Sequence, residues 1–361
     1  MFVAWRELRF ARGRFVLIGA VVALLTLLVG FLAGLAGGLA AQNVSSVLQL
    51  PGDRLVLQQG EDGDVAFSTS SLDADTIRQW DEAQGVHTVI PVGVTQSRVT
   101  AGDDETAVAL YGFGRTQENP GKNSLLEMSP DVDGQVGLSA GIADDLGVGV
   151  GDRLSITGQE FTVASIGADL WYSHTPVAVL TARDWSEASQ RVGGTGEATL
   201  LSVTGETDWA AVGAATGTVA ETPLASLSGL ESFQSEIGSL GLMVVMLFGI
   251  SALVVGAFFT VWTMQRTADI AVLKALGATT GSLIRDSLGQ ACIVLGAGIA
   301  VGLAAVVALG ALSEQALPFV LSPVTTLVPA VVMAVLGLAG ASFALRSVTH
   351  SDPLTALGSN R

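Results

Sequence analysis

Four long segments of the 361-residue chain carry almost no charge, and they constrain the fold more than any other feature. The first, residues 15–41, is a run of 27 residues without Asp, Glu, Lys or Arg. About 20 apolar residues are enough for a helix to cross a bilayer, whereas the apolar part of a secretory signal has only about 7–15. We therefore expect residues 15–41 to be a retained membrane span. Three further spans are expected at residues 237–263, 283–312 and 325–345.

Charge separates residues 42–237 from the rest of the chain. This stretch contains 28 Asp and Glu against 8 Lys and Arg, a net charge of −20, whereas the remainder carries 5 acidic and 9 basic residues, a net charge of +4. The composition is that of a soluble domain, which we bound at residues 42–226, and its acidity argues against nucleic acid as a partner. Residues 227–236 are amphipathic and are expected to continue into the second span as a stalk.

Basic residues mark one side of the expected membrane. Several arginines precede the first span, Arg266 and Lys274 follow the second, and Arg346 follows the fourth. The loop at residues 313–324 contains neither Lys nor Arg. By the positive-inside rule, both termini are cytoplasmic and the acidic domain faces outward, in a multi-pass protein whose spans contact lipid.

These features predict a membrane α-helical fold of four transmembrane helices, with an extracytoplasmic α+β domain inserted between the first and second spans. The N-terminal residues place arginines and aromatic residues at helical spacing, which is typical of an interfacial helix. The expected segments are a cytoplasmic amphipathic helix (1–14), a first span (15–41), the domain (42–226), a stalk and second span (227–263), a cytoplasmic loop (264–282), a third span (283–312), an outer loop (313–324), a fourth span (325–345) and a cytoplasmic tail (346–361).

Within the outer domain, alternating apolar residues and turn signals predict both strands and helices. Ser71 is expected to cap a helix that Gly85 ends, and Thr181 to cap another. Strands are expected at residues 54–58, 86–94, 106–113, 152–156, 160–166 and 198–203. Further helices are expected at 140–146, into which residues 136–139 lead, and at 208–215. The single cysteine, Cys292, lies in an apolar span, where we expect a small buried hydrophobe.

Gly30, Gly34 and Gly38 recur every four residues in the first span. A face of small residues lets another helix approach closely, so we expect this face to pack against a helix. The alternative is that glycine is simply common in this chain, which has 44 of them.

The loop between the second and third spans contains a short amphipathic pattern. Apolar residues recur at helical spacing over residues 270–277, and charged residues lie off that face. The positions concerned are Arg266, Asp269, Ile270, Leu273, Lys274, Leu276 and Gly277. Gly277 stands where a helix ends in a left-handed conformation. A helix of this kind either lies on anionic lipid or docks on another protein.

Three stretches resemble the MacB/FtsX class of ABC transporter permeases. Residues 266–279, Arg-Thr-Ala-Asp-Ile-Ala-Val-Leu-Lys-Ala-Leu-Gly-Ala-Thr, resemble the cytoplasmic loop of that class, which forms a coupling helix docked on a separate ATPase subunit. Residues 138–157 with 161–167 resemble the extracytoplasmic core domain of MacB-type permeases, and residues 352–358 resemble the tail. In size and organisation, the chain most resembles the HrtB-type haem exporter permeases.

The resemblance implies the permease subunit of a MacB-type ABC exporter in the bacterial plasma membrane. Such a permease is a homodimer that works with two copies of an ATPase, the subunit that binds ATP. It relays ATPase closure through the coupling helix and second span to the outer domain, a mechanism called mechanotransmission. Haem is the implied substrate. Export of another hydrophobic compound (a peptide, lipid or antibiotic), an FtsX-like signal relay that activates a cell-wall hydrolase, and a sensor without an ATPase stay open as alternatives.

The sequence contains no signature of an enzyme. It has no Gly-x-x-x-x-Gly-Lys-Ser/Thr phosphate loop and no Gly-x-Ser-x-Gly nucleophile motif. Its three histidines lie far apart, without Cys, His or acidic residues at the spacing of metal ligands. We therefore expect no catalytic residue, no metal site and no intrinsic cofactor, and ATP hydrolysis must come from a partner.

Residues near the outer end of the second span are candidates for substrate contact, and they are Glu231, Glu236, Met243 and Met246. Carboxylates at a membrane rim above thioethers suit an amphipathic metal complex such as haem, because Met is one of the axial ligands of haem iron. The alternative is that the glutamates are solvated stalk residues and the methionines are apolar fillers. The outer domain contains an aromatic and imidazole cluster, Trp171, Tyr172 and His174. This cluster either packs in the core of the domain or binds a ligand.

Overall fold

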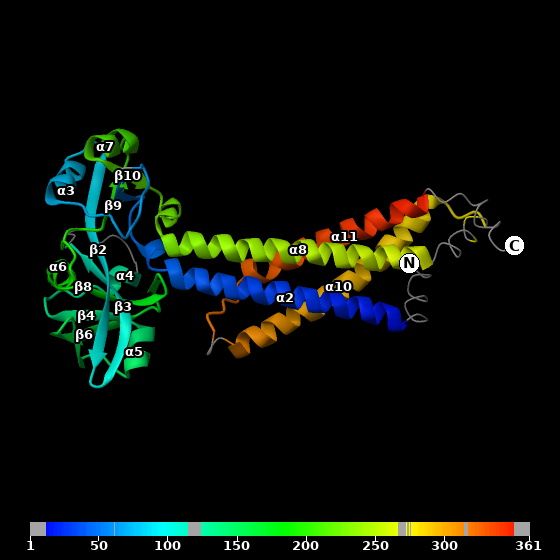
Figure 1. The fold of residues 1–361 in the computed structure, drawn as a ribbon, viewed down its shortest axis with the longest axis horizontal. Coiled ribbons are helices and arrows are strands. Elements are labelled where there is room, and N and C mark those ends of the chain that lie inside the picture. The colour runs from blue at the N-terminus through cyan, green and yellow to red at the C-terminus, as the bar shows by residue number, and fades with distance from the viewer. Residues whose placement is uncertain are drawn as a thin grey trace. The chain divides into compact units, whose positions relative to one another are not determined.

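Four long helices carry the apolar segments of the chain (Figure 1). They are α2 (Arg12–Val44), α8 (Glu231–Gln265), α10 (Thr280–Ser313) and α11 (Pro323–Thr349). Each is long and apolar enough to cross a membrane, so the prediction of four candidate spans is confirmed. The computed structural model describes residues 12–60, 62–114, 124–265, 272, 274, 276–313 and 317–349.

The chain divides into two compact units. The helical unit comprises Met1–Gly38 and Gly238–Arg361, and the β-rich unit comprises Leu39–Ile237. Because α2 ends at Val44 and α8 begins at Glu231, both helices cross this division without a break. The predicted stalk is therefore helical from Glu231 onward and continuous with the second candidate span.

Glycines determine how closely the helices of the helical unit approach one another. A Cβ atom added to Gly298 of α10 would lie 2.8 Å from atoms of α2, and one added to Gly302 would lie 2.6 Å from them. Gly340 of α11 meets the backbone of α8, with its added Cβ 3.1 Å from the Cα atom of Gly256. No real side chain fits at such distances without a shift, so the bare glycine backbone is what permits these contacts.

The β-rich unit is built on one ten-stranded sheet with the strand order β10-β1-β9-β2-β3-β8-β4-β6-β5, and β7 pairs with β8. The strands are β1 (Arg54–Gln58), β2 (Val86–Ala101), β3 (Asp104–Phe113), β4 (Gln135–Ser139), β5 (Arg153–Ile156), β6 (Gln159–Gly167), β7 (Trp171–Tyr172), β8 (Thr175–Thr181), β9 (Leu200–Gly205) and β10 (Thr218–Glu221). The long strand β2 pairs with β5 as well as with β3, so β2-β3-β8-β4-β6-β5 close into a ring.

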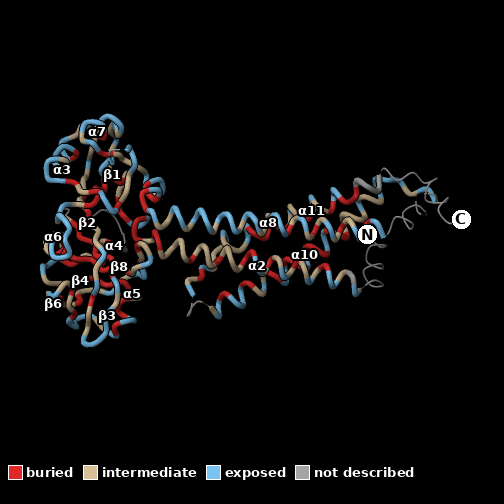
Figure 2. Tube along the Cα trace, viewed as in Figure 1, coloured by how far each residue is buried: buried red, intermediate tan, exposed pale blue. Residues whose placement is uncertain are grey.

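Short helices cover this sheet. They are α3 (Ala74–Asp81), α4 (Ser124–Glu127), α5 (Ala140–Leu146), α6 (Ala182–Arg191) and α7 (Trp209–Thr216), with 3₁₀ turns at Val47–Gln49 and Ala225–Gly229. Buried residues gather along the strands (Figure 2). Trp185 of α6 packs against the paired residues Gly93 and Gly112, where any added Cβ would collide with the indole ring. Absent side chains on β2 and β3 thus make room for the large one on α6.

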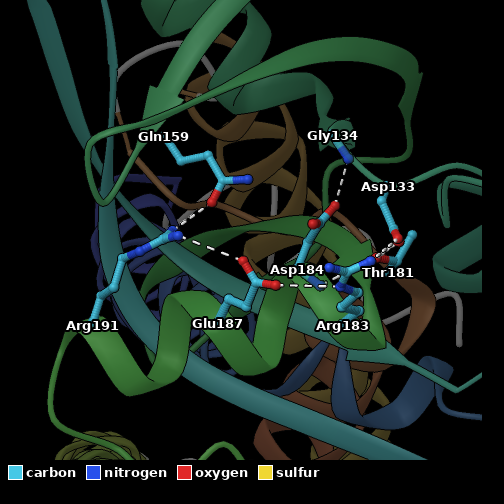
Figure 3. Close-up of polar contacts among 8 residues, drawn as sticks. All are labelled: Asp133, Gly134, Gln159, Thr181, Arg183, Asp184, Glu187 and Arg191. Atoms are coloured by element: carbon cyan, nitrogen blue, oxygen red, sulfur yellow. Dashed lines mark hydrogen bonds and ion pairs between the residues drawn. The ribbon is translucent and has the colours of Figure 1, made fainter.

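Polar contacts fix the start of α6 to neighbouring strands (Figure 3). Thr181 caps the helix by accepting the Asp184 N–H, and the buried Asp184 carboxylate accepts the Gly134 N–H at 2.6 Å. The Thr181 hydroxyl donates to Asp133 Oδ1 at 2.7 Å. The contacts from Arg183 to Asp133 and Glu187 and from Arg191 to Glu187 and Gln159 lie at the surface. Exposed ion pairs contribute little to stability, so the buried Asp184 contact is the stronger anchor of the helix.

Most of the predicted local structure is present. Residues 54–58 form β1, residues 140–146 form α5, and the Thr157-Gly158 turn joins β5 to β6. Thr181 caps α6 as expected. Strand β8 was not predicted, because nearly all of its side chains are buried and no polar–apolar alternation marks it.

Other local predictions are wrong. Asp73, not Ser71, caps α3, because its carboxylate accepts the Thr76 N–H at 2.7 Å while the Ser71 hydroxyl donates to Glu197. Helix α3 also ends at Asp81, before Gly85, and the strand expected at 86–94 continues to Ala101, where it pairs with β3 and β5. Cys292 is exposed rather than buried, because an apolar composition does not tell which side of a span packs inward.

Candidate functional site

Glu236, one of the predicted substrate-contact residues, lies in a polar cluster of the β-rich unit. Its Oε2 atom accepts a hydrogen bond from Asn43 Nδ2 at 3.1 Å and lies 2.9 Å from His174 Nε2. The three side chains come from the first turns of α8, the end of α2 and the turn between β7 and β8. The structure thus brings together two residues, Glu236 and His174, that the sequence suggested separately.

Two serines complete this cluster. The hydroxyl of Ser232 in α8 donates to Asn43 Oδ1 at 3.0 Å and lies 2.9 Å from the hydroxyl of Ser173. Asn43 is fully buried, and its amide is satisfied at both ends by α8. We call Asn43, Ser173, His174, Ser232 and Glu236 the junction cluster. Sequence analysis did not identify Asn43, Ser173 or Ser232, because nothing local marks them.

The β7–β8 turn has an unusual backbone. Tyr172 pairs with Thr175, so Ser173 and His174 alone form the loop, and their φ angles are +49° and +63°. Two-residue hairpins with two positive φ angles usually contain Asn-Gly or Asp-Gly, because residues with a Cβ avoid this conformation. Here the backbone N–H of Ser173 donates to Asn43 O at 2.9 Å, and that of His174 donates to Gln42 O at 3.0 Å.

These backbone bonds cap the end of α2. The last carbonyl groups of a helix lack partners within it, and the tip of the turn supplies two of them. Further bonds join Ser45 and Ser46 to Trp171, including Ser46 N–H to Trp171 O at 3.0 Å and Trp171 N–H to Ser45 Oγ at 2.9 Å. The end of α2 is therefore held to the β7–β8 hairpin by backbone as well as by side chains.

An apolar core supports the cluster. It joins Val44, the last residue of α2, and Val47 of the following 3₁₀ turn to Leu230, just before α8, and Phe233 of α8. Tyr111 and Tyr172 lie in the same core, with the Tyr111 hydroxyl 2.8 Å from Ser46 Oγ. Burial raises the pKa of the Tyr111 phenol well above its usual value, with a smaller effect in the same direction from Tyr172, while the hydrogen bond to Ser46 lowers it. Burial likewise raises the pKa of Tyr172.

A cavity of about 700 Å³ in the β-rich unit reaches the junction cluster at Ser173 and Ser232. Glu231 also lines this cavity, and its side chain is exposed. Of the other nineteen lining residues, eight are Ser or Thr and three are aromatic. Such a lining offers a ligand both hydroxyl groups and apolar surface.

The two methionines proposed for substrate contact belong to the helical unit. Met243 is 53% exposed and Met246 is 60% exposed, on the same helix as Glu231 and Glu236. Exposed apolar side chains on a candidate span are available to lipid, to a ligand or to another chain. The assignment of these four residues to substrate stays a prediction.

The predicted coupling loop, residues 264–282, is described only in part. Arg266, Asp269, Ile270 and Leu273 lie outside the described residues. Gly277 has a φ angle of +95°, and its N–H bonds to Lys274 O at 3.0 Å. The Leu276 side chain is 80% exposed. An exposed leucine beside a left-handed glycine suits a helix end with an apolar side open to a partner.

The glycines of the first span face other parts of the same chain. A Cβ added to Gly30 would lie 2.8 Å from Val306 of α10, and Gly34 and Gly38 lie against Phe319 and Pro318. The Gly34 carbonyl also accepts the Val320 N–H at 3.1 Å. These contacts lie within the helical unit, so in this structure the glycine face is covered by its own chain.

Comparison with known proteins gives matches over the whole length. Residues 241–353 match the family described as FtsX-like permease C-terminal. A Staphylococcus epidermidis protein named for hemin transport, the permease HrtB, is 25% identical over 361 residues, which cover 99% of each chain. An uncharacterized ABC transporter permease of Mycobacterium bovis is also 25% identical, again over 99% of each chain. The periplasmic region of MacB from Actinobacillus actinomycetemcomitans aligns with 50% of this chain and 92% of its own, at a TM-score of 0.34 and 10% identity.

Proposed function

Because the chain is an ABC transporter permease of the MacB/FtsX class, we propose that it is the membrane subunit of a haem exporter. The assignment of haem as the substrate rests on two relatives whose names refer to hemin transport, from two Staphylococcus species. Each match covers 99% of both chains. Four candidate spans and a β-rich unit of 199 residues, Leu39–Ile237, are compatible with a permease that handles its substrate at the outer side.

Energy for export comes from a separate ATPase in this proposal. The permease acts as a homodimer with two ATPase copies, and these bind the ATP. The loop at residues 264–282 provides the docking helix, and the exposed Leu276 at its end supports this role. Closure of the ATPase pair then moves α8, a helix of 35 residues that leads from this loop to the β-rich unit without a break. A long uninterrupted helix is rigid enough to carry such a movement.

Haem enters from the outer leaflet in this proposal, near the start of α8. Glu231 and Glu236 lie at the membrane rim, and Met243 and Met246 lie deeper along the helix, so that one group reaches the edge of the ring and another lies nearer its iron. Glu236 and Met243 are seven residues apart, so they share a helix face about 10 Å apart along the axis. Since the Glu236 carboxylate already contacts Asn43 and His174, the exposed Glu231 is the first residue to test.

Haem-stimulated ATP hydrolysis tests this function. The permease and its ATPase, reconstituted together in lipid nanodiscs, should hydrolyse ATP faster as haem is added. Glu231→Gln and Met243→Leu should weaken the response and the Soret shift of bound haem, whereas Glu160→Gln, at an exposed surface pair with Arg153, should not. No Soret shift with the unmutated complex would contradict haem as the substrate. Stimulation by a peptide or lipid instead would favour another exporter, and a rate insensitive to all of them would favour a signal relay.

The proposed orientation has a test of its own. Both termini lie in the cytoplasm and the β-rich unit lies outside the plasma membrane. A reporter inserted after Gly60, in an exposed turn, should be active only if it requires the external compartment. Activity confined to a cytoplasm-specific reporter at the same position would refute this topology.

A further inference from the structure

The β7–β8 turn is held in its left-handed conformation by bonds from outside the hairpin. Ser173 and His174 both have positive φ angles, which residues with a Cβ rarely adopt. Their backbone N–H groups bond to the end of α2, and their side chains contact Ser232 and Glu236 of α8. Without these partners, nothing in the sequence Ser-His favours such a turn.

Asn43, near the end of α2, bonds both to the β7–β8 turn and to α8. Its backbone carbonyl accepts the Ser173 N–H, and its side chain bonds to Ser232 and Glu236. One buried residue therefore ties the turn to the end of α2 and to the start of α8. All of these atoms belong to the β-rich unit.

On its C-terminal side, the β7–β8 turn leads into β8, a central strand of the sheet. Thr175 begins β8, whose residues 176–180 are all buried and which pairs with β3 on one side and β4 on the other. A displacement of the turn must therefore shift a central strand. The polar contacts of the turn, by contrast, are partly open to solvent, since the side chain of His174 is 39% exposed and that of Glu236 is 19% exposed. Water can replace such contacts more readily than it can separate the apolar core below.

We propose that the junction cluster is a releasable clasp that ties the β7–β8 turn to the ends of α2 and α8, and that it opens when the ATPase moves α8, which frees the turn and with it strand β8 to shift. This inference rests on the proposed function for its source of movement, and it assigns the coupling step to five named residues. The strained turn favours release, because Ser173 and His174 can relax to ordinary φ angles once their partners leave. The apolar contacts of Val44 and Phe233 keep α2 and α8 joined to the core of the β-rich unit while the clasp is open.

A disulfide lock tests the clasp. Ser173→Cys with Ser232→Cys, in a Cys292→Ser background, replaces two hydroxyls that are 2.9 Å apart. The matched control is Ser71→Cys with Thr195→Cys, whose hydroxyls are 3.0 Å apart elsewhere in the same unit. Each variant is reconstituted as the full permease–ATPase complex, and disulfide formation and ATP hydrolysis are measured.

Oxidation of the Ser173/Ser232 pair should lower ATP hydrolysis by about fivefold or more, as expected for coupling between distant sites, and reduction should restore it. The pair should also oxidise more slowly in the vanadate-trapped complex, where the clasp is open, than in the nucleotide-free complex. The control pair should show neither effect. Equal oxidation rates in the two states, or an unchanged ATPase rate after locking, would overturn the clasp.

These outcomes separate the clasp from the choice of substrate. If haem neither binds nor stimulates the complex while the lock still slows ATP hydrolysis, the haem assignment fails and the clasp stands. If haem stimulates ATP hydrolysis equally in locked and unlocked complexes, the exporter assignment stands and the clasp fails. His174→Ala offers a second variant, because loss of the imidazole should loosen the clasp and raise ATP hydrolysis without haem. An unchanged rate of ATP hydrolysis without haem in His174→Ala would count against the clasp.

Discussion

Asn43 and Glu236, 193 positions apart in the sequence, are joined by a hydrogen bond of 3.1 Å between Nδ2 and Oε2. The bond links the last turn of α2 to the second turn of α8, and its donor, the Asn43 side chain, is fully buried. Asn43→Ala should therefore destabilise the β-rich unit by about 1–3 kcal/mol, because Ser232 and Glu236 lose a buried partner. Thermal unfolding of the purified chain, followed by tryptophan fluorescence, measures the effect. Gln96→Ala, at an exposed position of β2, is the control, and an equal melting temperature in both variants would contradict the role of Asn43.

Gly340 of α11 should tolerate no large side chain. Its added Cβ lies 3.1 Å from Gly256 Cα and 3.3 Å from Gly256 N, and these backbone atoms cannot move aside cheaply. Gly340→Leu should cost about 1–3 kcal/mol by overpacking and should lower the melting temperature in detergent. Gly249→Leu in α8 is the matched control, since an added Cβ there meets nothing within 4 Å. If the two variants melt together, the α8–α11 contact is not a close one.

The sequence predicts what is local and misses what depends on packing. The four candidate spans follow from composition alone, and the Thr181 cap and the Thr157-Gly158 turn follow from residues a few positions apart. The junction cluster unites residues 43, 173–174 and 232–236, and no periodicity or motif connects such distant positions. Glu236 was a candidate because of its place at a membrane entry, but its partners were visible only in the fold. Cys292 shows the same limit within a helix, because its buried or exposed side is set by neighbouring helices.

Alkaline pH should destabilise the β-rich unit through its buried tyrosines. The pKa values of Tyr111 and Tyr172 are raised chiefly by burial, so both phenols stay protonated in the folded state after they have ionised in the unfolded chain. The unfolded state then binds fewer protons, and the free energy of unfolding falls as pH rises above about 10, the ordinary tyrosine pKa. Below that pH, both states are protonated and this contribution does not vary.

Tyr111→Phe measures the size of this effect. Between the unfolded and folded pKa values of Tyr111, its ionisation lowers the free energy of unfolding of the unmutated chain by about 1.4 kcal/mol per pH unit. The variant should lack this contribution. Denaturant titrations at a series of pH values around and above the ordinary tyrosine pKa give the two slopes. At neutral pH the variant should be somewhat less stable, because Ser46 Oγ loses the phenol 2.8 Å away. Parallel slopes for the two proteins would show that Tyr111 ionises equally in both states.

Leu276 should contribute to the contact with the ATPase if the loop at residues 264–282 is the docking helix. Its side chain is 80% exposed, next to Gly277 with its left-handed backbone. Leu276→Asp puts a charge on a surface that would be covered in the complex, and an unpaired charge is costly to bury. We expect the variant, like Leu273→Asp, to co-purify with less ATPase and to lose haem-stimulated hydrolysis. Val132→Asp, at an apolar side chain that is 58% exposed in the β-rich unit, is the control. Full ATPase association in both leucine variants would mean that this loop lies on lipid instead, and the driving subunit would have to dock elsewhere.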